Sequence, residues 1–140
     1  NGRLDSIQAA ILLEKIEIFD DELISRNKAA KYYTQNINKM FICPHIPDKY
    51  FSSWAQYSII IPENIKREAV ITKLEENGIP SMVYYKHPVH LQKGYVKYKN
   101  KLGDFPISED FSKRILSLPM HPYLKESDQD KVMNVLEYFS

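Results

Sequence analysis

The chain has 140 residues, a formal net charge of +1 and a hydrophobic share of 44%. This size and composition fit one globular domain with its own core and exclude a disordered chain. Nineteen basic residues are interspersed with eighteen acidic ones, so we expect no nucleic acid as partner. The apolar runs are far shorter than the ~20 residues of a membrane span. The single cysteine, Cys43, suits a reducing compartment, and we expect a cytoplasmic protein that does not enter a membrane.

The strongest helical pattern lies at the beginning of the chain. Asp5 followed by Gln8 is a capping-box arrangement, and apolar residues then recur at helical spacing with no proline before Pro44. Read as one helix, residues 5–38 would be ~50 Å long, whereas a compact domain of this size is ~37 Å across. With or without a break near Asp20, the first half should extend beyond the domain and leave an apolar stripe uncovered. The stripe consists of Ile7, Ile11, Leu12, Ile16 and Phe19.

The rest of the chain predicts shorter elements. Aromatic and β-branched residues favour strands over 52–61 and 79–85, and a strand that two prolines interrupt over 40–47. Because these strands alternate with helices, we expect an α+β fold: a small, mostly antiparallel sheet with helices on one face.

Three further helices are expected, over 65–77, 108–116 and 128–139. Ser127 with Asp130 is predicted to cap the last of them. The pattern divides the chain into a linking helix, residues 1–38, and a small C-terminal α+β domain, residues 39–140.

Local motifs offer little chemistry on their own. His87 and His90 have the spacing of zinc ligands on a helix, but Pro88 stands between them and no glutamate completes an H-E-x-x-H motif. The other two histidines, His45 and His121, are remote in sequence, so we predict no metal site. The segment between these histidines and Pro106 is long and irregular, as functional loops often are. Its lysines and tyrosines read as a solvated surface rather than as an anion site.

Three stretches together carry a more specific signal. They are NGRLDSIQAAILLEKI at 1–16, YYKHPVHLQKGY at 84–95 and FPISEDFSKRILSLPMHPYL at 105–124. In order and spacing they resemble the C-terminal part of the DegT/DnrJ/EryC1/StrS family of sugar aminotransferases, which depend on pyridoxal phosphate.

The resemblance implies a piece of a fold-type I enzyme. In this family a large N-terminal domain holds the cofactor, and a long helix leads from it into a small C-terminal domain. The segment with the family's cofactor-binding lysine is absent here, so we expect no catalytic residue, no bound pyridoxal phosphate and no activity in this chain alone. The full-length enzyme would be a homodimer that transfers an amino group from glutamate to a nucleotide-linked keto sugar, for amino-sugar or cell-surface polysaccharide synthesis.

The resemblance also implies site residues in the full-length enzyme. Asn1 matches the asparagine that reaches the cofactor phosphate of the other subunit, and Arg3 matches the arginine beside it. His90 matches a loop histidine at the mouth of the active site, and Tyr85 lies near the strand end that leads into this loop. We expect Asn1 and Arg3 to bind cofactor and Tyr85 and His90 to bind substrate.

Two alternatives stay open. A relative with other chemistry, such as a pyridoxal-phosphate-dependent sugar dehydratase, would differ at a cofactor-contacting residue outside this chain. A non-catalytic α+β module for dimerisation or binding is the second alternative. The uncovered stripe argues against the module, because soluble monomers rarely expose large apolar patches.

Overall fold

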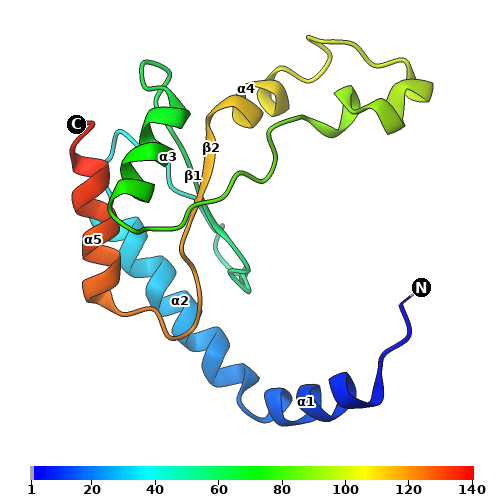
Figure 1. Ribbon diagram of the computed structural model, residues 1–140, viewed down its shortest axis with the longest axis vertical. Helices are drawn as coiled ribbons and strands as arrows, with labels where there is room; N and C mark the ends of the chain where they lie inside the picture. The colour runs from blue at the N-terminus through cyan, green and yellow to red at the C-terminus, as the bar shows by residue number, and fades with distance from the viewer. Residues whose placement is uncertain (1) are drawn as a thin grey trace.

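The computed structural model describes residues 2–140, so Asn1 lies outside the described residues. Two strands, five α-helices and two short 3-10 helices make up this part of the chain (Figure 1). In chain order they are α1 (Ser6–Glu17), α2 (Phe19–Asn36), β1 (Tyr57–Ile60), α3 (Arg67–Glu76), η1 (Val89–Leu91), η2 (Lys93–Tyr98), α4 (Pro106–Arg114), β2 (Ile115–Leu118) and α5 (Glu126–Glu137).

The sheet is a single antiparallel pair, β1 with β2, in which Tyr57 lies opposite Leu118 and Ile59 opposite Leu116. These four side chains alternate along their strands, so they share one face, and all four are buried. The same apolar core contains residues of three helices: Ala30 and Tyr33 of α2, Val70 and Leu74 of α3, and Val132 and Leu136 of α5. The expected α+β class, with helices packed on one face of the sheet, is therefore confirmed.

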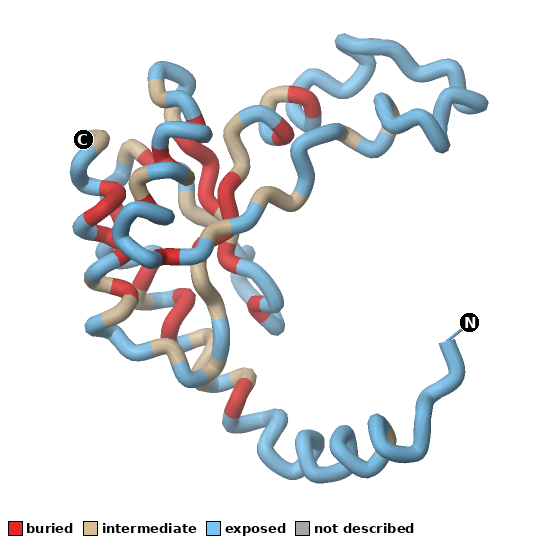
Figure 2. Tube along the Cα trace, viewed as in Figure 1, coloured by how far each residue is buried: buried red, intermediate tan, exposed pale blue. Residues whose placement is uncertain are grey.

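The N-terminal helical region is two helices rather than one. The capping box of Asp5 and Gln8 begins α1 as predicted, and Ile18 then leaves the helical conformation with a ψ of 4°. The two helices meet at a bend, which we call the elbow, and α1 curves away from the core (Figure 1). Every residue of α1 except Ala9 is exposed (Figure 2). All five residues of the predicted apolar stripe are exposed too, four of them in α1 and the last, Phe19, at the start of α2.

Two of the predicted strands are wrong in extent. Segments 40–47 and 79–85 each contribute only one isolated bridge, Ile42 with Ile60 and Met82 with Ser117. Prolines explain this, because Pro44, Pro47 and Pro80 lack the N–H that a longer ladder would use.

Two helix boundaries also differ from the prediction. The helix expected over 108–116 ends at Arg114, because Ile115–Leu118 pairs with β1 as strand β2. The last helix begins at Glu126 with Lys125 at its N-cap and no side-chain cap hydrogen bond. The predicted cap by Ser127 and Asp130 is therefore wrong, since both residues lie inside the helix.

Two segments project from the body of the fold. One is α1, and the other is the segment 86–105 with η1 and η2, which we call the arm. Figure 1 shows both on the same side of the molecule, with open space between them. From Leu91 to Ser108 every residue is exposed (Figure 2). No helix within residues 2–140 combines the length and the apolar character needed to cross a bilayer.

Candidate functional site

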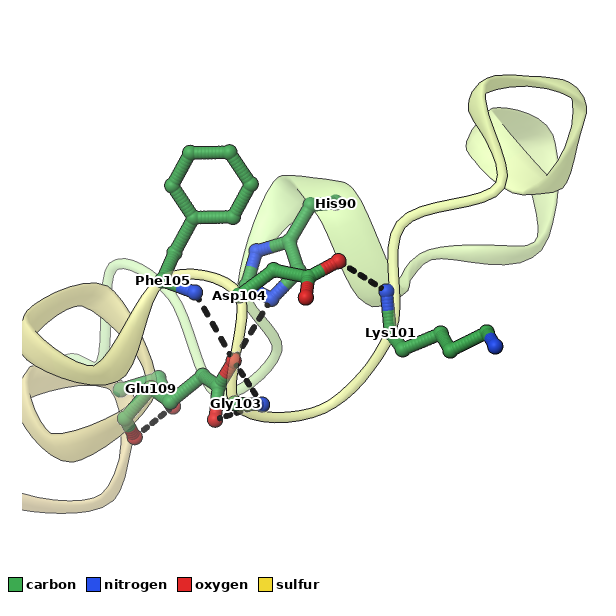
Figure 3. A network of polar contacts seen from close by, with 7 residues as sticks. His90, Lys101, Gly103, Asp104, Phe105 and Glu109 are labelled. Atoms are coloured by element: carbon green, nitrogen blue, oxygen red, sulfur yellow. Dashed lines mark hydrogen bonds and ion pairs between the residues drawn. The ribbon is translucent and has the colours of Figure 1, made fainter.

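The base of the arm is organised around the Glu109 carboxylate, at the first turn of α4 (Figure 3). Its Oε1 lies 2.8 Å from the Gly103 amide nitrogen, 3.3 Å from that of Phe105 and 3.0 Å from His90 Nε2. Its Oε2 lies 3.0 Å from the same Gly103 nitrogen. One carboxylate therefore joins the first helix of the arm, through His90, to the last residues of the arm.

The environment of Glu109 keeps it ionised. Burial alone would raise its pKa, but the hydrogen bonds from the Gly103 amide, from His90 and from the Phe105 amide outweigh burial, so the pKa lies below its ordinary value. The side chains of His90 and Glu109 are only 8% and 9% exposed. The His90 ring also packs on the Phe105 ring, with their centroids 4.7 Å apart.

A hollow of about 640 Å³ lies beside this cluster, between the start of the arm and α4. Its lining is mostly apolar and aromatic and includes Tyr84, Tyr85, Pro88, Phe105 and Phe111. A concave apolar surface with a few polar groups at its edge is the usual form of a small-molecule site. The hollow is therefore the leading candidate for a ligand site within residues 2–140.

A smaller hollow of about 300 Å³ lies within the arm itself. It is lined by Val89, His90, Tyr95, Asn100, Phe105 and Ser108. In the arm, the segment 86–103 carries lysines and no acidic residue, and all of these lysines are exposed. They are Lys86, Lys93, Lys97, Lys99 and Lys101.

The structure brings together two of the predicted site residues and separates a third. Tyr85 lines the larger hollow with 67% of its surface exposed, and His90 lies at the base of the same arm. Arg3 is exposed and precedes α1 in the chain, and α1 projects from the body of the fold separately from the arm (Figure 1). Asn1 lies outside the described residues. Within residues 2–140, no group of three metal-ligating side chains is placed to hold an ion.

Sequence reasoning missed Glu109 as an organising residue. A local signal existed: Phe105-Pro106 begins a helix, and a glutamate in its first turn can reach back to the N-terminal amides. The contact with His90, 19 positions earlier, has no such local signal.

Comparison with known proteins gives this geometry a family context. The family model described as the DegT/DnrJ/EryC1/StrS aminotransferase family matches residues 1–137. The chain belongs to this family.

Relatives of the chain agree with this membership. The chain is 38% identical over 125 residues to a UDP-2-acetamido-2-deoxy-3-oxo-D-glucuronate aminotransferase of Pseudomonas aeruginosa. This alignment covers 89% of the chain and 33% of the Pseudomonas protein. The chain is 32% identical to a dTDP-3-amino-3,6-dideoxy-alpha-D-galactopyranose transaminase of Aneurinibacillus thermoaerophilus, over 99% of this chain and 37% of that protein.

A solved structure of a family member superposes closely. The crystal structure of a DegT DnrJ EryC1 StrS aminotransferase from Brucella abortus has a TM-score of 0.88 and 47% sequence identity, and covers 98% of this chain and 36% of that one. The chain thus spans about a third of the length of these proteins. The superposition covers nearly the whole chain, including both projecting segments, and in the Brucella protein this region is part of a much larger chain.

Proposed function

We propose that this chain supplies the C-terminal part of a pyridoxal-phosphate-dependent aminotransferase that acts on a nucleotide-linked keto sugar, with glutamate as amino donor. The observation that carries the proposal is the family match over residues 1–137. The Pseudomonas and Aneurinibacillus relatives are both named as aminotransferases of nucleotide-linked sugars, and together they support this substrate class.

The described residues do not by themselves fit pyridoxal phosphate. A lysine that binds a cofactor covalently is commonly activated in an enclosed site, where desolvation lowers its pKa. Every lysine in residues 2–140 is exposed except the half-buried Lys73, which pairs with Glu76 on the surface of α3. No lysine lines the 640 Å³ hollow. In our proposal the rest of the enzyme holds the cofactor and supplies the electron sink for transamination, and this chain alone is inactive.

In our proposal the linking helix, residues 1–38, packs on that larger part of the enzyme, and residues 39–140 form the small domain. The exposed stripe of α1 supports this, because five large apolar side chains in water are costly for a soluble protein. Asn1 and Arg3, which begin this segment, would then reach the cofactor, with Asn1 crossing a homodimer interface.

The arm is the substrate-facing part of the small domain in this proposal. Tyr85 at the larger hollow and His90 at the base of the arm would contact the nucleotide-linked sugar. Glutamate as donor and a role in amino-sugar or polysaccharide synthesis follow the family pattern. A pyridoxal-phosphate-dependent sugar dehydratase is the second candidate, since the family resemblance in residues 1–137 is common to both.

The test is expression of the complete gene product with its cofactor. Purified enzyme, given glutamate and a panel of UDP-, dTDP- and GDP-linked keto sugars, should form an amino sugar and 2-oxoglutarate in equal amounts. A sugar product that has lost a hydroxyl group as water and carries no amino group would support the dehydratase instead. A product-free result with every sugar, in enzyme shown to be loaded with cofactor, would contradict the proposal.

The role of Asn1 has its own test in the same enzyme. Asn1→Ala should weaken cofactor retention, because losing a hydrogen bond to a charged group costs roughly 1.5–3 kcal/mol. Mixed dimers of this variant with a variant lacking the cofactor lysine should regain one working site. Absence of rescue would mean that Asn1 acts within its own subunit.

A further inference from the structure

We propose that Glu109 is a positioning residue of the candidate site: it closes the arm at its base and holds His90 with a hydrogen on Nε2, which leaves Nδ1 to accept a hydrogen bond from a substrate hydroxyl. The part that concerns substrate rests on the proposed function. The part that concerns the arm and the His90 tautomer stands on the geometry of this chain alone.

The tautomer follows from hydrogen-bond chemistry. An ionised carboxylate can only accept hydrogen bonds, so at 3.0 Å the hydrogen must belong to His90 Nε2. A neutral imidazole carries one hydrogen, and Nδ1 is then an acceptor. Within residues 2–140 no hydrogen bond to Nδ1 competes for that position. In its neutral form, His90 can therefore accept a hydrogen bond at Nδ1 but cannot donate one there.

The surroundings of His90 favour a hydroxyl over a phosphate as that donor. The 300 Å³ hollow that His90 lines also contains the side chains of Tyr95, Asn100 and Ser108 and the ring of Phe105. None of its lining residues is a lysine or an arginine, and the ionised Glu109 carboxylate beside His90 would repel a phosphate. Neutral polar groups beside an aromatic ring match the hydroxyls and the apolar C–H face of a sugar ring.

The arm closure follows from the other partners of Glu109. The Gly103 amide approaches both carboxylate oxygens and the Phe105 amide approaches one of them, while His90 comes from η1 at the opposite end of the arm (Figure 3). All the residues from Leu91 to Phe105 are exposed. The direction in which the arm projects, and with it the placement of His90, therefore depends mainly on Glu109 and on the packing of His90 against Phe105.

The first experiment needs no activity and no ligand. ¹⁵N chemical shifts of the His90 ring in the 140-residue chain, at about pH 8 where an ordinary histidine is neutral, should show hydrogen on Nε2 and none on Nδ1. A hydrogen on Nδ1, in a neutral or a doubly protonated ring, would overturn the proposal.

Glu109→Gln is the variant for the same measurement. An amide can accept from Nε2–H or donate to a bare Nε2, so the single tautomer should become a mixture. The NH₂ group of the glutamine would also face the Gly103 N–H or another donor, and two donors cannot hydrogen-bond each other. The base of the arm should loosen as a result, and the amide hydrogens of residues 91–103 should exchange several-fold faster. Glu126→Gln, in the exposed first turn of α5, is the matched control and should change neither readout. An unchanged tautomer and unchanged exchange in Glu109→Gln would overturn the positioning role.

The second experiment uses the complete enzyme and its best keto-sugar substrate from the panel. Glu109→Gln should raise KM several-fold, because only a fraction of the molecules keep the competent tautomer and arm position, with kcat nearly unchanged. In a His90→Ala background the same change should have little further effect on KM, because both residues act through one contact. A fall in kcat at constant KM, or additive effects, would overturn the substrate part. If the wild-type enzyme transfers no amino group at all, the proposed function fails, and the ¹⁵N measurement still decides the tautomer and the arm.

Discussion

Lys15 of α1 and Glu22 of α2 join the two helices across the elbow, with Lys15 Nζ 2.5 Å from Glu22 Oε1. The Tyr123 hydroxyl donates to the same oxygen at 2.7 Å. Tyr123 lies between β2 and α5, so Glu22 connects the projecting helix to the body of the fold. Beyond these contacts α1 is exposed, and the direction in which it projects therefore depends mainly on Glu22.

Glu22→Gln should loosen the elbow. The amide removes the charge that Lys15 pairs with and offers one acceptor oxygen in place of two. Spin labels on α1 and on α2 should then report a broader distance distribution, while thermal unfolding of the core changes little. The matched control is Glu126→Gln, which removes an exposed ion pair with Lys28 at 3.9 Å. An equally narrow distribution in Glu22→Gln would mean that backbone geometry at Ile18 alone sets the bend.

The elbow should also respond to pH at both ends of the scale. The hydrogen bond from Lys15, and after it the one from Tyr123, lowers the pKa of Glu22. The stabilisation of the elbow by Glu22 is therefore complete above the ordinary glutamate pKa and is lost as pH falls through the lowered value. The hydrogen bond to Glu22 raises the pKa of Lys15. The stabilisation of the elbow by Lys15 is therefore complete below the ordinary lysine pKa and is lost as pH rises through the raised value. The same spin-label distances should be narrow between these limits and broaden outside them. Broadening near neutral pH would contradict this assignment.

The shared core should be sensitive at β1. Ile59 is fully buried and belongs to the core that α2, α3 and α5 share, so Ile59→Ala should lower the free energy of unfolding by about 2–5 kcal/mol. Ile24→Ala, on the exposed face of α2, should change it by less than about 0.5 kcal/mol. Urea unfolding followed by circular dichroism measures both. Equal effects of the two variants would contradict the core described above.

Sequence patterns predicted the parts of this fold that depend on near neighbours. The capping box of Asp5 and Gln8 needs only residues three apart, and the inward positions of α5, such as Val132 and Leu136, follow from helical spacing. The family resemblance likewise rests on three short motifs, and the match over residues 1–137 confirms it.

Contacts between distant segments could not be read from the sequence. Ile115 continues the helical pattern of α4, and only pairing with Ile60, 55 positions earlier, makes it a strand residue. His90 was selected by its motif, but its partner Glu109 was not, because nothing local shows that the arm returns to its own base. The elbow also contains a contact of this kind, since the Tyr123 hydroxyl donates to Glu22, 101 positions earlier.

Gly103 should be the least replaceable glycine of the arm. Its φ of +98° is unfavourable for any residue with a Cβ, whereas Gly94 has no positive φ, and neither position has an atom close enough to clash with an added methyl. Gly103→Ala should therefore act through backbone conformation alone, at a cost above about 1 kcal/mol to the closed turn. Because its amide is a main partner of Glu109, hydrogen exchange across 91–103 should accelerate. Gly94→Ala is the control, and acceleration of the same size there would contradict the role given to the Gly103 turn.

The open stripe of α1 leads to the last prediction, for the 140-residue chain in solution. Ile7, Ile11 and Ile16 are 73%, 58% and 65% exposed, and Leu12 and Phe19 beside them are also in water. Full burial of each such side chain is worth ~1.5–3 kcal/mol, so a substitute partner should be favoured when the larger part of the enzyme is absent. We expect the chain to self-associate through α1, with a light-scattering mass that grows with concentration. Ile11→Lys and Ile16→Lys should each reduce the association and leave the circular dichroism of the core unchanged. Ala10→Lys is the control: it adds the same charge without removing a large apolar group, so it should leave the association intact. A monomeric wild-type chain in which hydrogen exchange shows residues 6–17 protected would mean that α1 is stable alone, and the packing proposed for its stripe would be wrong.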